Sequence, residues 1–179
     1  MSLQGVIFDL DGTLVDSRLD FNAIRREMQI PDGQPILEAL DAMPAGDHKT
    51  ECLRILRRHE QAGAEQATLI PGVREFLSEL TRRDIRQGVL TRNSRESTQQ
   101  VTERLGLEFS IVLTREDAPP KPDPTGLLLI CEKWGISVKR TIFIGDFQFD
   151  LQAGRNAEIR SVLYCPGDLP EYAGEADFV

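Results

Sequence analysis

The sequence predicts an α/β fold, a three-layer doubly wound parallel sheet with a small all-helical insertion. Strand-like and helical segments alternate along most of the 179 residues, the pattern typical of parallel sheets covered on both faces. The first strand-like run, from Val6 to Phe8, is wholly apolar, as in a strand buried on both faces. Residues 17–70 show only helical patterns and form too long a segment for a loop. We therefore expect an α/β core at 1–16 and 71–179 and a helical insertion at 17–70.

Each expected strand is followed by a turn and a helical pattern. The strands are expected at residues 5–10, 85–90, 109–113, 141–145 and 160–164, with a last edge strand near 177–179. The insertion is expected to hold helices at about 19–28, 34–42 and 47–65, separated by segments that contain proline and glycine.

The helix ends of the core carry their own signals. Asn93, with a glutamate three residues later, resembles the start of a capping box, and Gly106 is expected to end that helix. Asp123 is expected to cap the next helix, with proline at the first helical position, and Gly135 to end it.

Composition limits the classes of partner. The chain is 40% hydrophobic and 28% charged, with a net charge of −8, which argues against nucleic acid or an anionic membrane as a partner. A phosphorylated small molecule remains compatible, because a local metal or lysine can invert the field. No apolar stretch is long enough to cross a bilayer.

The terminus and the cysteines indicate a compartment. The first four residues run directly into the first strand, so no signal peptide is expected. The three cysteines, Cys52, Cys131 and Cys165, are odd in number and far apart, which fits neither a disulfide framework nor a zinc ribbon. We expect a protein of the reducing cytoplasm, and the sequence leaves its oligomeric state open.

Chemistry-bearing residues follow the expected strands. Asp9 and Asp11 leave the first strand two positions apart, before a glycine that allows a sharp turn. Like charges this close call for a cation or a shared proton. Ligands of open parallel sheets bind beyond the carboxyl ends of the strands, so both acids are expected at the site. An ordinary Asp-Gly turn is the alternative interpretation.

Three further groups lie just past other strands. Thr91, Arg92 and Asn93 open a helix, where a hydroxyl and free N–H groups suit a phosphate, although capping and surface polarity also account for them. Prolines on both sides stiffen the backbone around Lys121, which is otherwise interpreted as a solvated lysine. Asp146 follows a strand directly and an acid lies four positions later; carboxylate oxygens are what Mg²⁺ prefers. That second acid is Asp150.

In this order and spacing, the four groups resemble those of the haloacid dehalogenase-like (HAD) hydrolase superfamily, over essentially the whole chain. The opening Asp-Leu-Asp-Gly-Thr-Leu-Val-Asp-Ser is its most specific motif. The resemblance is to the phosphatase branch with a small helical cap, similar to phosphoglycolate phosphatases. It implies a Rossmann-like core, a cap at residues 17–70, and a Mg²⁺-dependent phosphoric monoester hydrolase acting on a small phosphorylated metabolite.

The resemblance also implies a role for each residue. Asp9 would take the phosphoryl group, and Asp11 would protonate the leaving oxygen and later deprotonate water. Thr91 with N–H groups near Asn93, and Arg92 beside them, would hold phosphate oxygens, and Lys121 would balance charge. Mg²⁺ would be held by Asp9, the main-chain carbonyl of Asp11, Asp146 and, in support, Asp150.

The sequence departs from relatives at Phe147 and Phe149, where small or polar residues are more usual, and Phe147 is placed to narrow the pocket. In the expected cap, His48, Cys52 and His59 project to similar angles of one helix, which we interpret as packing because a fourth metal ligand is lacking.

Four other functions are alternatives for this sequence. Hydrolytic dehalogenation does not require an acid two positions after the nucleophile, so the presence of Asp11 favours phosphoryl chemistry. Phosphonoacetaldehyde hydrolysis would use Lys49 as a Schiff base, but that family has a small residue in place of Asp11. A hexose phosphomutase uses the same two aspartates and is the stronger alternative. A catalytically idle binding module is disfavoured by four intact motifs.

Overall fold

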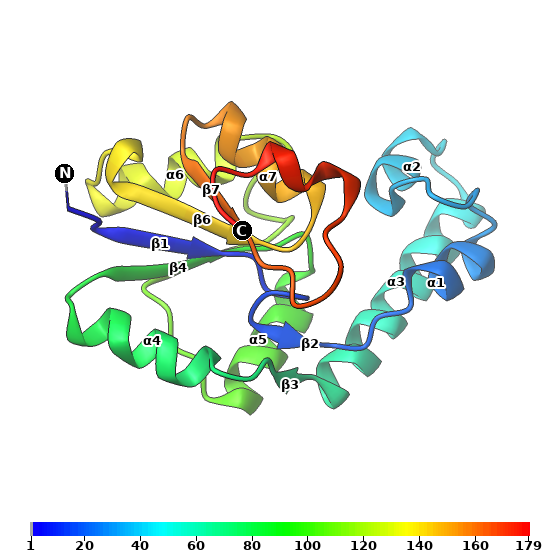
Figure 1. The fold of residues 1–179 in the computed structure, drawn as a ribbon. Helices are drawn as coiled ribbons and strands as arrows, with labels where there is room; N and C mark the ends of the chain where they lie inside the picture. The colour runs from blue at the N-terminus through cyan, green and yellow to red at the C-terminus, as the bar shows by residue number, and fades with distance from the viewer. Residues whose placement is uncertain (1) are drawn as a thin grey trace. The chain divides into compact units, whose positions relative to one another are not determined.

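Five parallel strands form one sheet in the order β5–β4–β1–β6–β7 (Figure 1). The computed structural model describes residues 2–179. The strands are β1 (Gly5–Phe8), β4 (Arg86–Leu90), β5 (Ile111–Leu113), β6 (Thr141–Gly145) and β7 (Arg160–Leu163). β1 lies in the centre and pairs in parallel with both β4 and β6. The predicted α/β fold with a parallel, doubly wound sheet is confirmed.

Helices cover the two faces of this sheet. α4 (Val73–Arg82) and α5 (Arg95–Leu105) lie on one face, and α6 (Thr125–Trp134) and α7 (Gln148–Asn156) on the other (Figure 1). Short 3₁₀ turns, η1 (Val138–Arg140) and η2 (Glu171–Glu175), complete the core. The change of face occurs between β5 and β6, so β1 and β6 present their carboxyl ends beside a crossover, where open sheets bind ligands.

The helix ends agree with the sequence only in part. Gly106 and Gly135 adopt the left-handed conformation that ends α5 and α6, as predicted. Asn93 does not cap α5: Ser94 is the N-cap, and its hydroxyl accepts a hydrogen bond from the Ser97 N–H at 3.3 Å. Asp123 precedes the N-cap position of α6, although its carboxylate accepts from the Thr125 N–H at 2.8 Å. A polar side chain one position away can also cap the helix, so the sequence predicts the exact first residue of a helix poorly.

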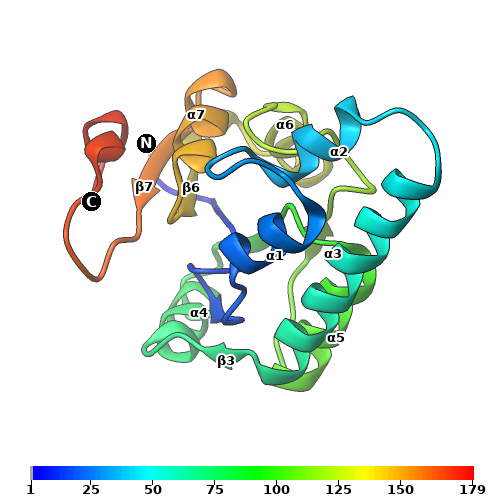
Figure 2. The same ribbon diagram turned by 90° about the vertical axis from the view of Figure 1, so that its right-hand side faces the viewer.

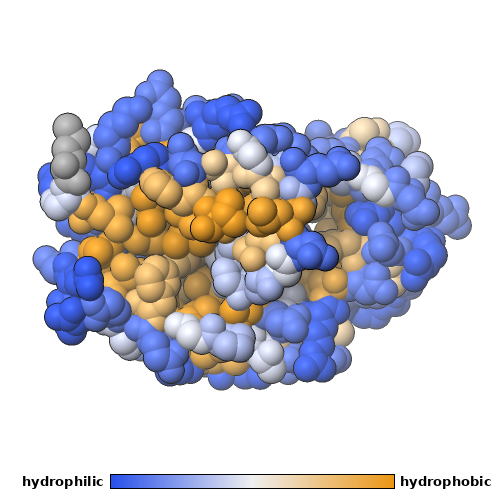
Figure 3. All heavy atoms as spheres, in the orientation of Figure 1, coloured by the Kyte–Doolittle hydropathy of each residue, from blue (hydrophilic) through white to orange (hydrophobic). Residues whose placement is uncertain are grey.

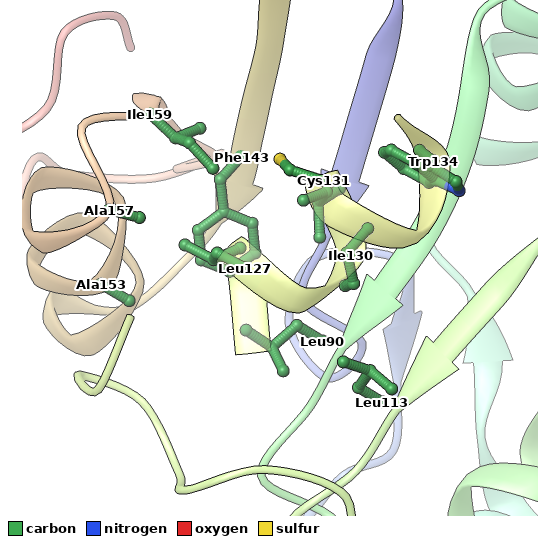
Figure 4. Packing of buried hydrophobic residues seen from close by; sticks show 11 residues of the cluster. Leu90, Leu113, Leu127, Ile130, Cys131, Trp134, Phe143, Ala153, Ala157 and Ile159 are labelled. Atoms are coloured by element: carbon green, nitrogen blue, oxygen red, sulfur yellow. The ribbon is translucent and has the colours of Figure 1, made fainter. Parts of the chain in front are cut away.

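The main hydrophobic core lies between the sheet and the α6–α7 face (Figure 4). Phe143 of β6 is fully buried against Leu127 of α6, and Leu90 and Leu113 extend the contact across β4 and β5. Burying such side chains contributes about 1.5–3 kcal/mol each. This packing fixes the carboxyl ends of β1, β4 and β6, which Asp9, Thr91 and Asp146 follow.

The opposite face is covered less completely. In the view of Figure 3, apolar residues gather on the core over β1 and β6 and around the C-terminus. Ile142 and Ile144 of β6 point to this face and are half-buried, while Phe8 of β1 is covered by an edge-to-face contact with Phe76 of α4 at 6.0 Å. Near the C-terminus, Phe178 forms a single isolated β-bridge with Val162. The edge strand predicted at residues 177–179 is therefore wrong.

Residues 17–67 form a second compact unit of three helices. These are α1 (Phe21–Met28), α2 (Ile36–Ala42) and α3 (Asp47–Gln66), and α1 packs along α3 (Figure 2). Their apolar sides meet in a core that includes Ile24, Leu40 and Leu56. Asp20 caps α1 by accepting from the Ala23 N–H at 2.9 Å.

The expectation that residues 17–70 contain no strand is wrong at one end. Thr68–Leu69 forms β3, which pairs antiparallel with β2 (Val15–Asp16), and both belong to the core unit. Here the chain leaves the core and returns beside its own path in the opposite direction. A two-residue strand has no periodicity that sequence could reveal. No helix among residues 2–179 combines the length and apolar character needed to cross a membrane.

Candidate active site

The site begins at the carboxyl ends of three adjacent strands. Asp9 follows β1, Thr91 follows β4 and Asp146 follows β6. Backbone hydrogen bonds extend the sheet through the first two: the Asp9 N–H donates to the Ile144 carbonyl at 2.8 Å and the Thr91 N–H to the Leu113 carbonyl at 3.0 Å. The backbone of Asp9 and of Thr91 therefore continues the pairing of the sheet.

Three carboxylates gather at this edge. Asp9, Asp146 and Asp150 each offer an oxygen, and the three atoms lie within 4.8 Å of one another. Asp150 comes from the first turn of α7 and also accepts a hydrogen bond from the Phe147 N–H at 3.0 Å. Thr13 donates to Asp146 Oδ1 at 3.3 Å. The spacing of four positions between the last two acids thus brings both to one side, as the sequence predicts.

Lys121 places an ammonium group inside this cluster. Its Nζ lies 2.5 Å from Asp9 Oδ1 and 2.7 Å from Asp150 Oδ1, and its side chain is 2% exposed. A buried lysine needs such partners because an unpaired charge is costly away from water. Arg92 donates to the backbone carbonyl of Lys121, which ties the lysine-bearing loop to the segment that follows β4.

The electrostatics show an excess of negative charge. Burial raises the pKa of Asp9 well above its usual range; Lys121 opposes this rise, and Asp150 and Asp146 reinforce it. Burial, reinforced by Asp150, raises the pKa of Asp146 to about 6. Burial alone would lower the pKa of Lys121, but Asp150 and Asp9 outweigh it and hold that pKa above its usual range. The single ammonium group of Lys121 therefore offsets only part of the negative charge of three carboxylates. A further cation would offset the rest.

Two glycines make room for the carboxylates. Gly12 has φ of +80°, and a Cβ there would stand 2.2 Å from Asp146 Oδ2. A Cβ on Gly145 would stand 2.3 Å from Cγ of Asp150. Neither position can carry a side chain unless a carboxylate moves. Glycine at these two positions therefore leaves the space that the carboxylates occupy.

A second hydrogen-bonded group lies at the same edge of the sheet. The Asn93 side-chain amide donates to Asp11 Oδ2, and the Asn93 N–H donates to Thr91 Oγ1 at 3.1 Å. Thr91 is buried, and Asp11 is partly buried. Asp11 thus keeps one carboxylate oxygen oriented by an amide donor, two residues beyond Asp9.

Sequence reasoning missed several supporting contacts. Tyr172 of η2 donates to the backbone carbonyl of Asp146 at 3.2 Å, and the Arg92 guanidinium lies 4.7 Å from the Phe149 ring centroid. Thr13 stands inside the opening motif and could have been found there, whereas Tyr172 lies 26 positions from its partner and no local signal marks it. The contacts of Arg92 join the lysine loop to α7, and its part in phosphate binding stays a prediction.

The candidate residues of the helical unit do not form a metal site. Cys52 Sγ lies 3.8 Å from His48 Nε2, while His59 contacts Glu27 at 2.8 Å. Among residues 2–179, the only cluster of three potential ligands is the one formed by the three aspartates. The Lys49 ammonium donates to the backbone carbonyls of Asp41 and Met43 at 3.4 and 3.2 Å.

A comparison with known protein families shows the family to which the chain belongs. The sequence model described as haloacid dehalogenase-like hydrolase matches residues 6–164, which include every strand apart from the first residue of β1 and every aspartate of the cluster. The chain belongs to this family. It is therefore a HAD-like hydrolase, as its motifs predict.

The chain is similar to related proteins, in sequence and in structure, over nearly its whole length. It is 32% identical to an N-acetylmuramic acid 6-phosphate phosphatase of Pseudomonas aeruginosa, covering 97% of this chain and 89% of the relative. It is 27% identical to a phosphoglycolate phosphatase of Xanthomonas campestris, covering 97% and 90%. The crystal structure of a hydrolase from Pseudomonas syringae superposes with a TM-score of 0.78 at 25% identity, covering 98% and 92%.

Proposed function

We propose that this HAD-like hydrolase is a Mg²⁺-dependent phosphatase that hydrolyses a small phosphorylated metabolite through a phosphoryl group on Asp9. The observation that carries the proposal is the Lys121 ammonium held between Asp9 and Asp150 in a carboxylate cluster. An anionic nucleophile can approach a phosphate only where positive charge offsets the repulsion. Relatives that are themselves phosphatases support the same chemistry.

The residues present fit a hard divalent cation. Asp9, Asp146 and Asp150 supply oxygen ligands within a few ångströms of one another, and a Cβ at Gly12 or Gly145 would displace two of them. Asp9, the carbonyl of Asp11 and Asp146 would hold Mg²⁺, with Asp150 in support. When bound, Mg²⁺ supplies charge stabilisation for the phosphoryl oxygens.

The chain's own residues then divide two half-reactions. A carboxylate oxygen of Asp9 attacks phosphorus and the bond to the ester oxygen breaks, while Asp11 gives that oxygen a proton. Asp11 next accepts a proton from the water that attacks phosphorus, and the bond to Asp9 breaks to release phosphate. The amide of Asn93 orients Asp11 for both transfers. Thr91 accepts a hydrogen bond from the Asn93 N–H and keeps its own hydroxyl proton to donate to a phosphate oxygen.

The proposal is tested by phosphate release from a panel of phosphorylated metabolites, measured with Mg²⁺, with chelator, and with Asp9→Asn in Mg²⁺. We expect release only from the wild-type protein with Mg²⁺. Full activity in chelator would contradict the metal assignment. Conversion of a hexose phosphate into its isomer, without release of phosphate, would identify a phosphomutase instead.

A further inference from the structure

Three aromatic side chains gather beside the proposed cation site. The ring centroids of Phe147 and Phe149 lie 5.2 Å apart, and that of Tyr172 lies 5.8 Å from Phe147, all with edge-to-face geometry. Phe147 directly follows Asp146, and Phe149 directly precedes Asp150. The aromatic cluster is defined by these three rings. Phe147 and Phe149 are carried on the same turn of chain as two of the carboxylates, and Tyr172 reaches them from η2.

Phe147 occupies a helix-capping position where a short polar residue is usual. It is the N-cap of α7, where Ser, Thr, Asp and Asn are preferred because their side chains accept a hydrogen bond from the first turn. A phenyl ring cannot do this, and the turn is fixed instead by Asp150, which accepts from the Phe147 N–H at 3.0 Å. Phe147 is nevertheless 49% exposed. Local rules broken in this way are typical of functional positions.

The aromatic cluster is held in place from two sides. Tyr172 donates to the carbonyl of Asp146, and Gln148 donates to Glu175 at 3.0 Å, so η2 is attached to the start of α7. Figure 1 shows η2 (red) beside α7. On the other side, the Arg92 guanidinium lies over Phe149. A ring supported in this way can bind a ligand with little loss of side-chain entropy.

We propose that the exposed ring of Phe147 is a specificity determinant that stacks on the leaving group of the substrate. It selects phosphate esters whose leaving group carries a ring, either an aryl group or the C–H face of a sugar, over short acyclic esters. The ring faces are electron-rich and the neighbouring cluster is acidic, so they favour a neutral carbon-rich group over an anionic one. This inference rests on the proposed phosphatase function.

The experiment compares benzyl phosphate with methyl phosphate, two alkyl esters that differ by the ring. The ratio of their kcat/KM values is measured for the wild type, Phe147→Ser and Phe147→Tyr. Phe178→Ser is the matched control, because that phenylalanine is 52% exposed and belongs to neither the cluster nor the proposed machinery. We expect the ratio to fall about tenfold in Phe147→Ser, the value of one aromatic contact, and to be retained in Phe147→Tyr and Phe178→Ser.

A binding measurement separates this inference from the proposed function. The affinities of benzylphosphonate and methylphosphonate, which cannot be hydrolysed, are measured by calorimetry with Mg²⁺ for the same variants. A ratio unchanged in Phe147→Ser, or lowered equally in Phe178→Ser, overturns the inference even if both esters are hydrolysed. If the wild type releases phosphate from no member of the metabolite panel, the proposed function fails, and the ratio of the two affinities decides the inference by the same criteria.

Discussion

At the scale of single residues, Lys121 is the group on which the electrostatics of the site depend. It is the ammonium that contacts two of the three carboxylates, so Lys121→Met leaves Asp9 and Asp150 without that partner. We expect kcat/KM to fall by about 10²-fold or more, as for a lost electrostatic donor. Lys139→Met is the control, because its pair with Glu158 is exposed and such pairs stabilise little.

The same substitution is expected to lower the free energy of unfolding by about 3 kcal/mol at neutral pH, the usual effect of breaking a buried ion pair. Urea denaturation of both lysine variants in chelator measures this. A Lys121→Met protein as stable and as active as Lys139→Met would show that the buried pairing has neither role.

Asp146 gives the metal-free protein a characteristic dependence on pH. Its pKa rises from about 4 in an unfolded chain to about 6 when folded, because of burial and Asp150. The folded state therefore binds more protons between these values, and its stability is highest below pH 4 with respect to this group and declines as pH rises through 6. Mg²⁺ should remove the decline, because it favours the charged form.

Thermal denaturation at pH 5 and pH 7, with chelator or Mg²⁺, measures this effect, and Asp146→Asn is the control that lacks the titrating group. We expect Mg²⁺ to raise Tm more at pH 7 than at pH 5 in the wild type. Equal shifts at both pH values, or a pH dependence as large in Asp146→Asn as in the wild type, would contradict the assignment to Asp146. A smaller remainder in that variant is expected from Asp9, whose pKa burial also raises.

At the scale of elements, the turn after β1 is built to receive the carboxylate that follows β6. Gly12→Ala would place a Cβ 2.2 Å from Asp146 Oδ2. Gly72→Ala would add the same left-handed strain, but its Cβ would have no heavy atom of residues 2–179 within 4 Å apart from those of its chain neighbours. Both should be destabilised by roughly 1–2 kcal/mol. Only Gly12→Ala should also weaken Mg²⁺ binding, which calorimetric titration of the metal alone will show. Equal Mg²⁺ affinities in the two variants would argue against this role of the turn.

The elements also show what the sequence can predict and why. Strand ends were predictable: Asp9 and Asp146 follow short apolar runs that are typical of buried strands, and parallel strands place their carboxyl ends at one edge of the sheet. Contacts set by tertiary packing were not. The two-residue strand Thr68–Leu69 is too short to show a period, the cap of α5 shifted by one residue to Ser94, and Tyr172 reaches Asp146 from a distant 3₁₀ turn.

At the scale of the whole molecule, the core and the helical unit have separate tasks in our account. In the proposed mechanism the motifs of the core hold only the phosphoryl group, so we propose that the unit at residues 17–67 acts as a cap that discriminates between substrates, together with Phe147. Binding energy from remote parts of a substrate can lower the barrier to reaction. A small cap fits a small metabolite.

Substitution of Arg18, Arg25 or Lys49 by alanine tests this division. We expect each to change the relative kcat/KM among phosphorylated metabolites by several-fold while acetyl phosphate, which has almost no leaving group to recognise, is hydrolysed at nearly the wild-type rate. Loss of acetyl phosphate hydrolysis in a protein that still folds would place a residue of the helical unit in the chemistry itself.

In the proposed mechanism Asp9 carries the phosphoryl group during turnover. The most direct measurement is rapid acid quenching during turnover with Mg²⁺, followed by mass spectrometry of the peptide that contains Asp9 and Asp11. We predict a phosphoryl group on Asp9 that appears with substrate and decays as phosphate is released, and turnover lowered by roughly several orders of magnitude in Asp9→Asn. Steady release of phosphate by Asp9→Asn at the wild-type rate would contradict the account.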